Sequence, residues 1–401
     1  MAFKKILKIF LINFFLLLTL LIIITYLFEI YLQFNTELIT NSGTANRDYK
    51  SKIYKKKTGK NYDKRTKYEL YEDSKNKIEN LVISSHPRIF MKNKNIFGVS
   101  GISNKKTILC NESGEYVIFE SDKYGFRNLN KKWNSAEFEN VLVGDSFVQG
   151  ACVNRPHDLA SQFDLLNKKV NLNLGYNGNG PLIELATLRE YLPKNTKNIL
   201  WFFYEGNDFE NLHRELNNPI LGKYLNNKNF NQDLKNNQNI INDYIEKNFI
   251  NFFQYYSELE KKRDKNNEFS FKKLIFLKNC RKFYNLYIKD NLIKNNIDHI
   301  YFEYFEKIIK EAKNIAKKNN SNFYFIYLPE YRRYTDFFYN NYQKNKILDI
   351  LKLLNIDYID IDELSFSNKN AKSFFPYELP GHYTEKGNKL IAETIHNLLK
   401  Q

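Results

Sequence analysis

The sequence has 401 residues, of which 43% are hydrophobic and 16% aromatic, so it can bury a sizeable core and is not an intrinsically disordered chain. Its formal net charge of +16 comes from 61 Lys and Arg against 45 Asp and Glu. These cations are scattered among asparagines over the whole chain. No stretch concentrates them with interleaved aromatic residues, which argues against nucleic acid as a partner.

The N-terminus predicts a membrane anchor. Lys4, Lys5 and Lys8 precede an uncharged run over residues 9–28, which ends at Glu29. A helix of 20 residues is long enough to cross a bilayer, whereas a cleaved signal peptide has a shorter apolar region and a small-residue cleavage site. The lysines before the span place the N-terminus in the cytoplasm and the rest of the chain outside it. The lipid bilayer is therefore the first expected partner.

The three cysteines predict at most one disulfide. Cys110, Cys152 and Cys280 are too few for a disulfide scaffold, and they lack the spacing of a metal site. No metal is expected. In an exported domain Cys110 and Cys152 can pair, which would leave Cys280 free.

Patterning divides the rest of the chain into segments. Residues 29–86 are polar and rich in Lys and Tyr, and they predict a stalk. Residues 87–400 predict one large domain, which opens with a β-rich segment at 87–137. Residues from about 213 to 300 predict a helical insertion over the sheet, which either forms a lid or only packs.

The core pattern alternates between strands and helices. Short apolar runs predict strands at residues 138–143, 169–174, 198–204, 322–328 and 356–361, the last one nearer an edge. Helical patterns separate them, for example at 181–191, 301–318 and 385–399. This alternation predicts a parallel sheet covered on both faces, with ligands bound beyond the carboxyl ends of its strands.

Three segments follow predicted strands at that edge. Gly144-Asp145-Ser146 offers a serine in a tight turn, where a nearby base could activate it, although the same residues also make ordinary helix caps. Residues 173–181 hold three glycines, including Gly178, in a loop whose N–H groups could face a ligand. Glu205-Gly206-Asn207-Asp208 offers a side-chain amide, although alone it is more typical of an Asx turn.

A fourth segment lies before the final helix. His382 stands in a Gly-led loop, and Thr384 is a suitable N-cap for the helix that follows. His157, which comes soon after Ser146, is its nearest competitor among six histidines.

In this order the four segments resemble the blocks of the SGNH/GDSL hydrolase family: Gly-Asp-Ser, Gly, Gly-Asn-Asp and a late His. The resemblance covers residues 138–210 and 375–399. It implies an α/β fold, a flavodoxin-like three-layer α/β/α domain that hydrolyses or transfers acyl groups without a cofactor. By position it implies that Ser146 is the nucleophile and His382 the general base. The Ser146 N–H, Gly178 and Asn207 would form the oxyanion hole.

One position departs from the family pattern. The acid that orients the histidine usually lies three residues before it, and here that residue is Leu379. Glu378, one residue out of register, is the substitute we expect, with Asp360 and Asp362 as more distant options. A backbone carbonyl or a Ser–His dyad would also be compatible with turnover.

Together these features predict an anchored esterase outside the cytoplasm. Its substrate would be an acylated, for example O-acetylated, cell-envelope glycan or lipid, cleaved through an acyl-enzyme. The alternatives are an O-acyltransferase that modifies an exported polysaccharide, which would need an acyl-donor membrane protein as partner, and a non-catalytic envelope-binding protein on the same scaffold.

Overall fold

The computed structural model describes residues 2–35, 47–91, 95–265, 271–285, 299–336 and 339–400. The chain divides into two compact units, Met1–Arg47 with Lys261–Asn296 and Asp48–Glu260 with Ile297–Gln401. Parts of the predicted stalk (36–46) and of the predicted insertion (266–270 and 286–298) lie outside the described residues.

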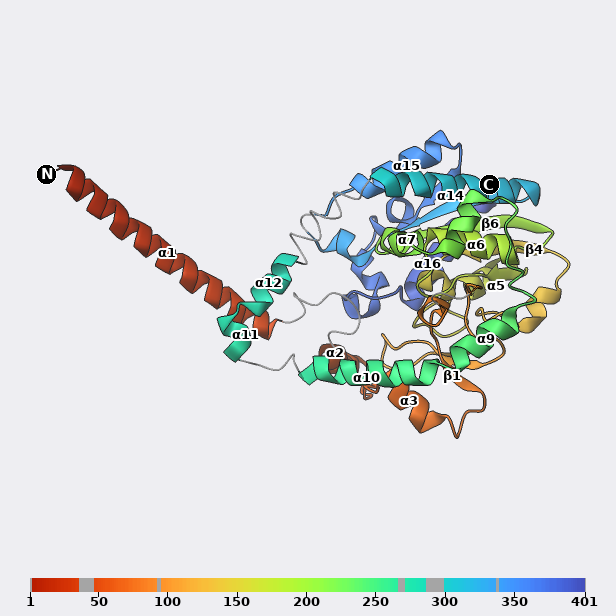
Figure 1. Ribbon diagram of the computed structural model, residues 1–401, viewed down its shortest axis with the longest axis horizontal. Coiled ribbons are helices and arrows are strands. Elements are labelled where there is room, and N and C mark those ends of the chain that lie inside the picture. Colours follow the sequence, from red (N-terminus) through yellow and green to blue (C-terminus); the bar gives the residue numbers. More distant parts are fainter. Residues whose placement is uncertain are drawn as a thin grey trace. The chain divides into compact units, whose positions relative to one another are not determined.

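A five-stranded parallel sheet forms the centre of the larger unit (Figure 1). Its strands are β4 (Phe138–Val143), β5 (Asn171–Asn173), β6 (Thr196–Tyr204), β7 (Asn322–Leu328) and β8 (Asp357–Asp360). They lie in the order β5-β4-β6-β7-β8, and every neighbouring pair is parallel. This is the flavodoxin-like strand order that the motif resemblance implies. All five strands fall within the predicted apolar runs or within two residues of them, and β8 lies at an edge as expected.

Helices cover both faces of the sheet. Alternate residues of β4 enter different cores: Val141 and Val143 join one hydrophobic cluster and Leu142 the other. The first cluster is closed by α6 (Pro181–Tyr191) and α14 (His299–Lys318), and the second by α5 (Leu159–Asn167) and α16 (Glu385–Leu399). A further helix, α15 (Tyr342–Leu353), precedes β8. The domain is therefore a three-layer α/β/α structure.

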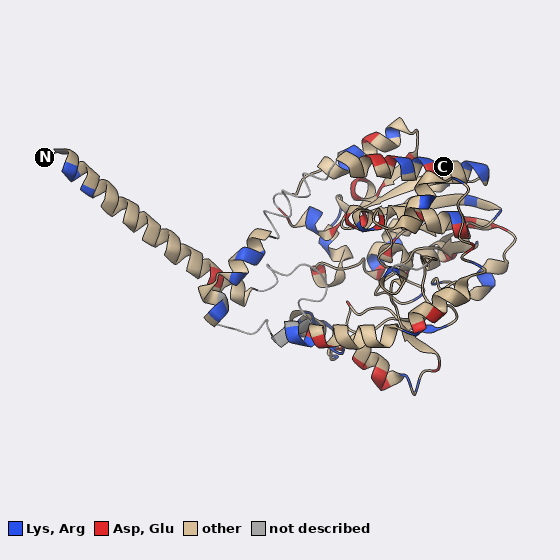
Figure 2. Ribbon diagram, in the orientation of Figure 1, with Lys and Arg blue, Asp and Glu red and all other residues tan. Residues whose placement is uncertain are grey.

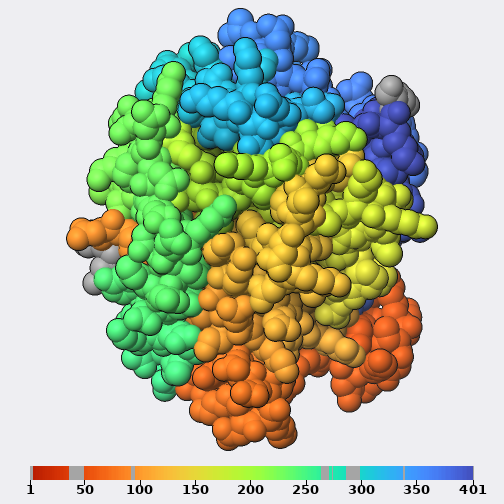
Figure 3. All heavy atoms as spheres, turned by 90° about the vertical axis from the view of Figure 1, so that its right-hand side faces the viewer, coloured from red at the N-terminus to blue at the C-terminus, as the bar shows by residue number. Residues whose placement is uncertain are grey.

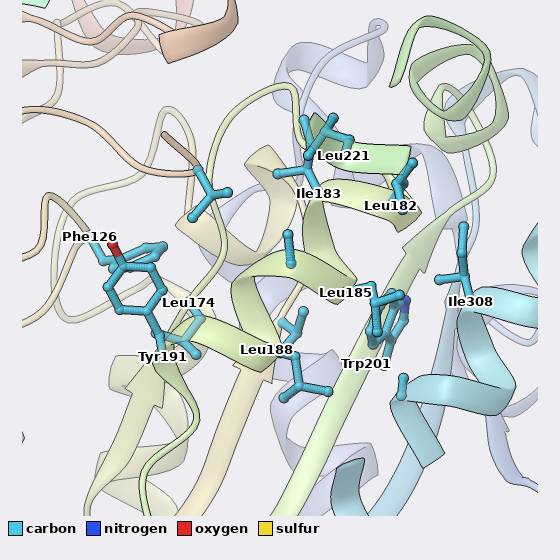
Figure 4. Close-up of a cluster of buried hydrophobic side chains, with 14 of the residues drawn as sticks. Phe126, Leu174, Leu182, Ile183, Leu185, Leu188, Tyr191, Trp201, Leu221 and Ile308 are labelled. Atoms are coloured by element: carbon cyan, nitrogen blue, oxygen red, sulfur yellow. The ribbon is translucent and has the colours of Figure 1, made fainter. Parts of the chain in front are cut away.

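The first of these cores is aromatic as well as aliphatic (Figure 4). Leu185 and Leu188 of α6 point toward Trp201 of β6, and Ile308 of α14 lies on the other side of the indole. Trp201 is fully buried. Burying apolar surface stabilises the folded state by about 25 cal/mol per Å². This layer therefore holds in place the strands whose ends form the site.

The segment before the sheet is more structured than the sequence predicts. A second sheet of three strands contains β1 (Leu81–Ile83), β2 (Lys106–Ile108) and β3 (Ile118–Glu120), with β1 parallel and β3 antiparallel to β2. The β-rich segment thus begins before residue 87. Helices α2 (Arg47–Thr58) and α3 (Lys67–Ser74) precede it, and Tyr54, Tyr62 and Leu70 are buried. From residue 48 onward the predicted stalk is part of the folded unit.

The predicted insertion is helical, as expected. It follows α7 (Asp208–Glu215) with α8 (Pro219–Asn226), α9 (Gln238–Glu246) and α10 (Phe249–Lys265). Part of it covers the β-rich segment rather than the central sheet: the Gln238 side chain donates to the Gly101 carbonyl and Asn242 pairs with Ser103. Figure 3 shows these two stretches side by side on one face of the surface.

The smaller unit contains α1 (Ala2–Phe34), α11 (Phe271–Ile275) and α12 (Lys278–Tyr284). Figure 2 shows basic residues near the start of α1, then a long stretch without charge. The helix over residues 3–34 is long and apolar enough to cross a membrane, and some signal sequences share this property.

Candidate active site

Ser146 is the first residue of a short helix, α4 (Ser146–Gln149), directly beyond the carboxyl end of β4. Asp145 caps this helix, since its Oδ1 accepts from the Phe147 N–H at 2.8 Å. Gly144 permits the close approach of strand and helix, because a Cβ there would lie 2.5 Å from Val148 Cγ2. The turn fixes the Ser146 hydroxyl, and the residue is only 4% exposed.

His382 reaches the same point from the other end of the chain. Its loop precedes α16, which Thr384 caps by accepting from the Gly387 N–H. His382 Nε2 lies 2.9 Å from Ser146 Oγ, which is hydrogen-bonding distance. The sequence predicts this proximity, and the geometry is that of a base beside a serine hydroxyl.

The residue behind His382 is Glu112, not Glu378. Glu112 Oε1 lies 3.0 Å from His382 Nδ1, and its Oε2 accepts from the His382 backbone N–H at 2.7 Å. Glu378 contacts this region through its backbone, where its carbonyl accepts from the Tyr331 hydroxyl. Within the described residues a Glu112–His382–Ser146 line is therefore continuous, and the expectation for Glu378 is corrected.

Glu112 lies in a hairpin that a disulfide cross-links to the rest of the domain. The residue lies in the loop between β2 and β3, and Leu109 and Val117 pair across the base of that loop. Cys110 and Cys152 form a disulfide with a Cα–Cα distance of 5.1 Å, as the sequence predicts, and Cys280 is free. The disulfide joins the hairpin to the segment that follows α4, so it ties the acid to the element that holds the serine.

Helix α2 and the segment after it support the same hairpin. The Tyr62 hydroxyl donates to the Asn111 carbonyl at 3.1 Å. Tyr54 packs against Gly114, where an added Cβ would come within 2.2 Å of the ring. Tyr377 donates to the Ser113 carbonyl from the loop that leads to His382. The acid loop is thus held on several sides.

Charges in the site favour an ionised acid beside a basic imidazole. Burial lowers the pKa of His382, but the Glu112 carboxylate, with a further contribution from Asp145, outweighs burial, and the net pKa lies above the ordinary value for histidine. Burial raises the pKa of Glu112, but His382 and Lys50 hold the net pKa well below its usual range. Glu112 is therefore a carboxylate at neutral pH.

Three neighbouring strands lead to the residues expected to form the oxyanion hole. Gly178 follows β5, Ser146 follows β4 and Asn207 follows β6, and these strands are adjacent in the sheet. Gly178 has a φ of +80°, a conformation that favours glycine. In the part of the chain that the structure describes, no group accepts a hydrogen bond from the N–H of Ser146 or of Gly178.

The Asn207 side chain makes no capping hydrogen bond to the helix that follows it. The residue is the N-cap of α7, and its Oδ1 has no partner among the described residues. Its amide faces Asp145, and this contact opposes the rise that burial causes in the pKa of Asp145. The amide thus lies beside the residue that precedes Ser146.

The other histidines lie elsewhere. His157 Nε2 is 3.6 Å from Glu385, on the surface, and is not the partner of Ser146. His86 is buried and bonded to Asn179. His213 pairs with Tyr301. His299 lies beside Glu303.

The site holds few side chains that could be ligands of a metal ion. Among the described residues, Glu112, Cys152 and His382 bring possible ligand atoms within 4.8 Å of one another. The Cys152 sulfur is bonded to Cys110, so it is not a thiolate, which is the form that binds metals.

One signal in the sequence could have located Glu112. If Cys110 pairs with Cys152, the segment after Cys110 must lie close to the segment after Ser146, and Glu112 is the first acid in it. The motif blocks direct attention to residues near His382 instead, and so they miss an acid that the fold supplies from a different region.

No protein-family model and no curated protein matches the sequence. Several solved structures are similar. A lipolytic protein of the G-D-S-L family from Desulfitobacterium hafniense DCB-2 is 14% identical, with 65% of this chain and 99% of that chain covered and a TM-score of 0.34. Another member, from Veillonella parvula DSM 2008, is 12% identical over 66% of this chain and 99% of that chain, with a TM-score of 0.35.

An acetyl xylan esterase, AlAXEase, is 12% identical, with 65% of this chain and 100% of that chain covered and a TM-score of 0.34.

Proposed function

We propose that the protein is a serine-dependent acyl-ester hydrolase of the SGNH/GDSL type. The observation that carries this proposal is the hydrogen-bonded line from Glu112 through His382 to Ser146. An acid hydrogen-bonded to an imidazole that is hydrogen-bonded to a serine hydroxyl is a catalytic triad. This arrangement activates the serine on several unrelated folds. The family pattern has an acid three residues before the histidine, where this chain has Leu379, and Glu112 from the disulfide-bonded hairpin takes its place.

The reaction proceeds in two halves. His382 Nε2 takes the proton of Ser146 as Oγ attacks the ester carbonyl carbon, and the negative charge on the carbonyl oxygen is stabilised by the N–H groups of Ser146 and Gly178 and the Asn207 amide. The C–O bond then breaks, and His382 returns the proton to the departing alcohol. Water attacks the acyl-enzyme, gives its proton to His382, and the acid leaves as Ser146 recovers that proton.

The substrate we propose is an acylated glycan or lipid of the cell envelope. The lysines before residue 9 favour an N-terminus in the cytoplasm and a catalytic domain outside it. The Cys110–Cys152 disulfide is compatible with that location, since disulfides persist in oxidising compartments. Hydrolysis needs no second protein, whereas an acyltransferase would need a donor, and this is why we favour hydrolysis.

A fluorophosphonate probe tests the proposal, because it reacts only with an activated serine. We expect the full chain to be labelled and Ser146→Ala and His382→Ala to remain unlabelled. Ser135→Ala, which alters a partly exposed serine outside the site, is the matched control and should be labelled like the wild type. Absence of labelling in the wild type, with the fold intact by circular dichroism, would favour the envelope-binding alternative.

A further inference from the structure

The end of α1 has a partner within its own unit. Glu29 is fully buried, and its carboxylate accepts from the backbone N–H of Asn279 at 3.0 Å and of Cys280 at 2.7 Å. A buried carboxylate is costly unless it is hydrogen-bonded, so these two bonds fix α12 against α1. Because α12 comes from residues 278–284, a segment far along the chain folds back onto the N-terminal helix.

Apolar contacts extend the same interface. The rings of Phe28 and Phe283 meet edge to face with centroids 5.3 Å apart, and Leu32 is fully buried. Cys280 Sγ lies 3.8 Å from the Thr25 carbonyl. We call α11 and α12 together, residues 271–284, the collar. It contacts α1 between Thr25 and Glu29.

The outer surface of the collar is apolar and basic. Phe271, Ile275, Phe276 and Tyr284 are 69%, 56%, 60% and 51% exposed, a concentration of large apolar side chains that is unusual on a water-facing surface. Cations stand among them, at Lys272, Lys278, Arg281 and Lys282, and residues 271–285 contain no Asp or Glu. The basic residues of α11 and α12 are visible in Figure 2.

The length of α1 sets the depth of the collar. A bilayer core of about 30 Å is crossed by about 20 helical residues, so a span that starts after Lys8 ends near Phe28. The collar contacts α1 on both sides of that point. It therefore lies where acyl chains give way to headgroups, the region in which aromatic and basic side chains accumulate.

We propose that the collar is a lipid-binding surface, seated in the outer headgroup region of a bilayer that contains anionic phospholipid. Its aromatic and aliphatic side chains would enter the acyl boundary, and its lysines and arginine would attract the anionic headgroups. This proposal rests on α1 spanning the membrane. It does not depend on the ester hydrolysis proposed above.

Bromolipid quenching of an introduced indole tests this placement. The full chain carrying Phe276→Trp is reconstituted into phosphatidylglycerol–phosphatidylcholine vesicles whose lipids are brominated either near the headgroup or near the chain end. The control is Leu353→Trp, which alters a 71% exposed residue of α15 in the other unit. We expect loss of the Phe276→Trp emission, stronger with the shallow label, and no loss for Leu353→Trp beyond that of the wild type.

The outcomes separate the collar from the anchor. Equal emission loss for both variants overturns the collar proposal, as does quenching by the deep label alone. Lys278→Gln with Lys282→Gln should remove the excess quenching seen in phosphatidylglycerol over pure phosphatidylcholine, and an unchanged excess overturns the anionic preference. Extraction of the wild type from membranes by alkaline carbonate would refute the span, whereas retention with an unquenched indole refutes only the collar.

Discussion

Glu112 and His382 are 270 residues apart in the chain, yet two hydrogen bonds join them, one to the imidazole and one to the backbone N–H. The carboxylate thus fixes both the orientation of the ring and the loop that carries it. In this position an acid selects the tautomer whose Nε2 is free to accept the Ser146 proton. The two residues come from different layers of the structure, the hairpin of the small sheet and the loop before α16.

Glu112→Gln is expected to lower kcat on a small acetyl ester by about 10²- to 10⁴-fold, because the ring loses the charge that stabilises its cationic form. The pH dependence should also change. His382 acts as a base only when neutral, so kcat/KM rises as the pH passes through its pKa, and Glu112 raises that pKa. Without the carboxylate the rise should move to lower pH, as measured by a pH–rate profile.

Glu378→Gln is the matched control for that experiment. Glu378 accepts a hydrogen bond from the Tyr331 hydroxyl through its backbone carbonyl, which the substitution keeps. Both kcat and the pH profile should remain those of the wild type. The reverse pattern, with loss in Glu378→Gln and none in Glu112→Gln, would contradict the assignment of the acid.

The disulfide should matter for both stability and turnover. C110S/C152S opens a cross-link between residues 42 apart, which in the chain-entropy model costs about 4 kcal/mol of unfolding free energy. Because Glu112 follows Cys110 closely, its loop gains freedom, and kcat should fall while KM changes little. Urea unfolding and steady-state kinetics measure the two effects.

A purely structural disulfide would leave a different signature. If the bond positions Glu112, the pH–rate profile of the folded C110S/C152S variant should shift in the same direction as that of Glu112→Gln. Cys280→Ser should change neither profile nor kcat, because Cys280 lies in the other unit. A wild-type pH–rate profile in the double variant would mean that the hairpin positions Glu112 without the disulfide.

Local patterns in the sequence were enough to predict the central sheet. Buried parallel strands are continuous apolar runs, and the helices between them have their own period, so β4, β7, α6 and α16 have the predicted bounds. The order of the motif blocks also placed Ser146 and His382 together. These features depend on near neighbours or on strand ends that meet at one edge.

The stalk and the acid depend on distant contacts instead. Residues 47–86 have few apolar side chains, and those that are buried, such as Tyr54 and Tyr62, are spaced without a helical or strand period. Their burial follows from packing against the hairpin after Cys110, which no local pattern reveals. Glu112 was missed for the same reason, since its partner lies near the other end of the chain.

Gly178→Ala should impair turnover through strain in the loop after β5. Gly178 has a φ of +80°, and an added Cβ would lie 3.2 Å from His86 Cδ2 and 3.3 Å from Arg88 Nη2. The His86 ring is hydrogen-bonded to Asn179, so it cannot easily move away from the added methyl group. We expect kcat to fall as the N–H moves away from the oxyanion. Gly222→Ala, in a helix with open space around the new methyl group, should leave kcat unchanged.

Asn207→Ala tests the third oxyanion donor. Removing one such donor typically costs about 10²–10³ in kcat, and KM should change little, because the hydrogen bond forms with the charge of the transition state rather than with the bound ester. The fold should survive, since the Asn207 side chain makes no capping bond to α7 and its Oδ1 lacks a partner among the described residues. Thermal unfolding followed by circular dichroism checks this, and Asn226→Ala, at the exposed end of α8, serves as the control. If the Asn207→Ala enzyme turns over a small acetyl ester at the wild-type rate, the amide serves only Asp145, and the oxyanion is stabilised by backbone N–H groups alone.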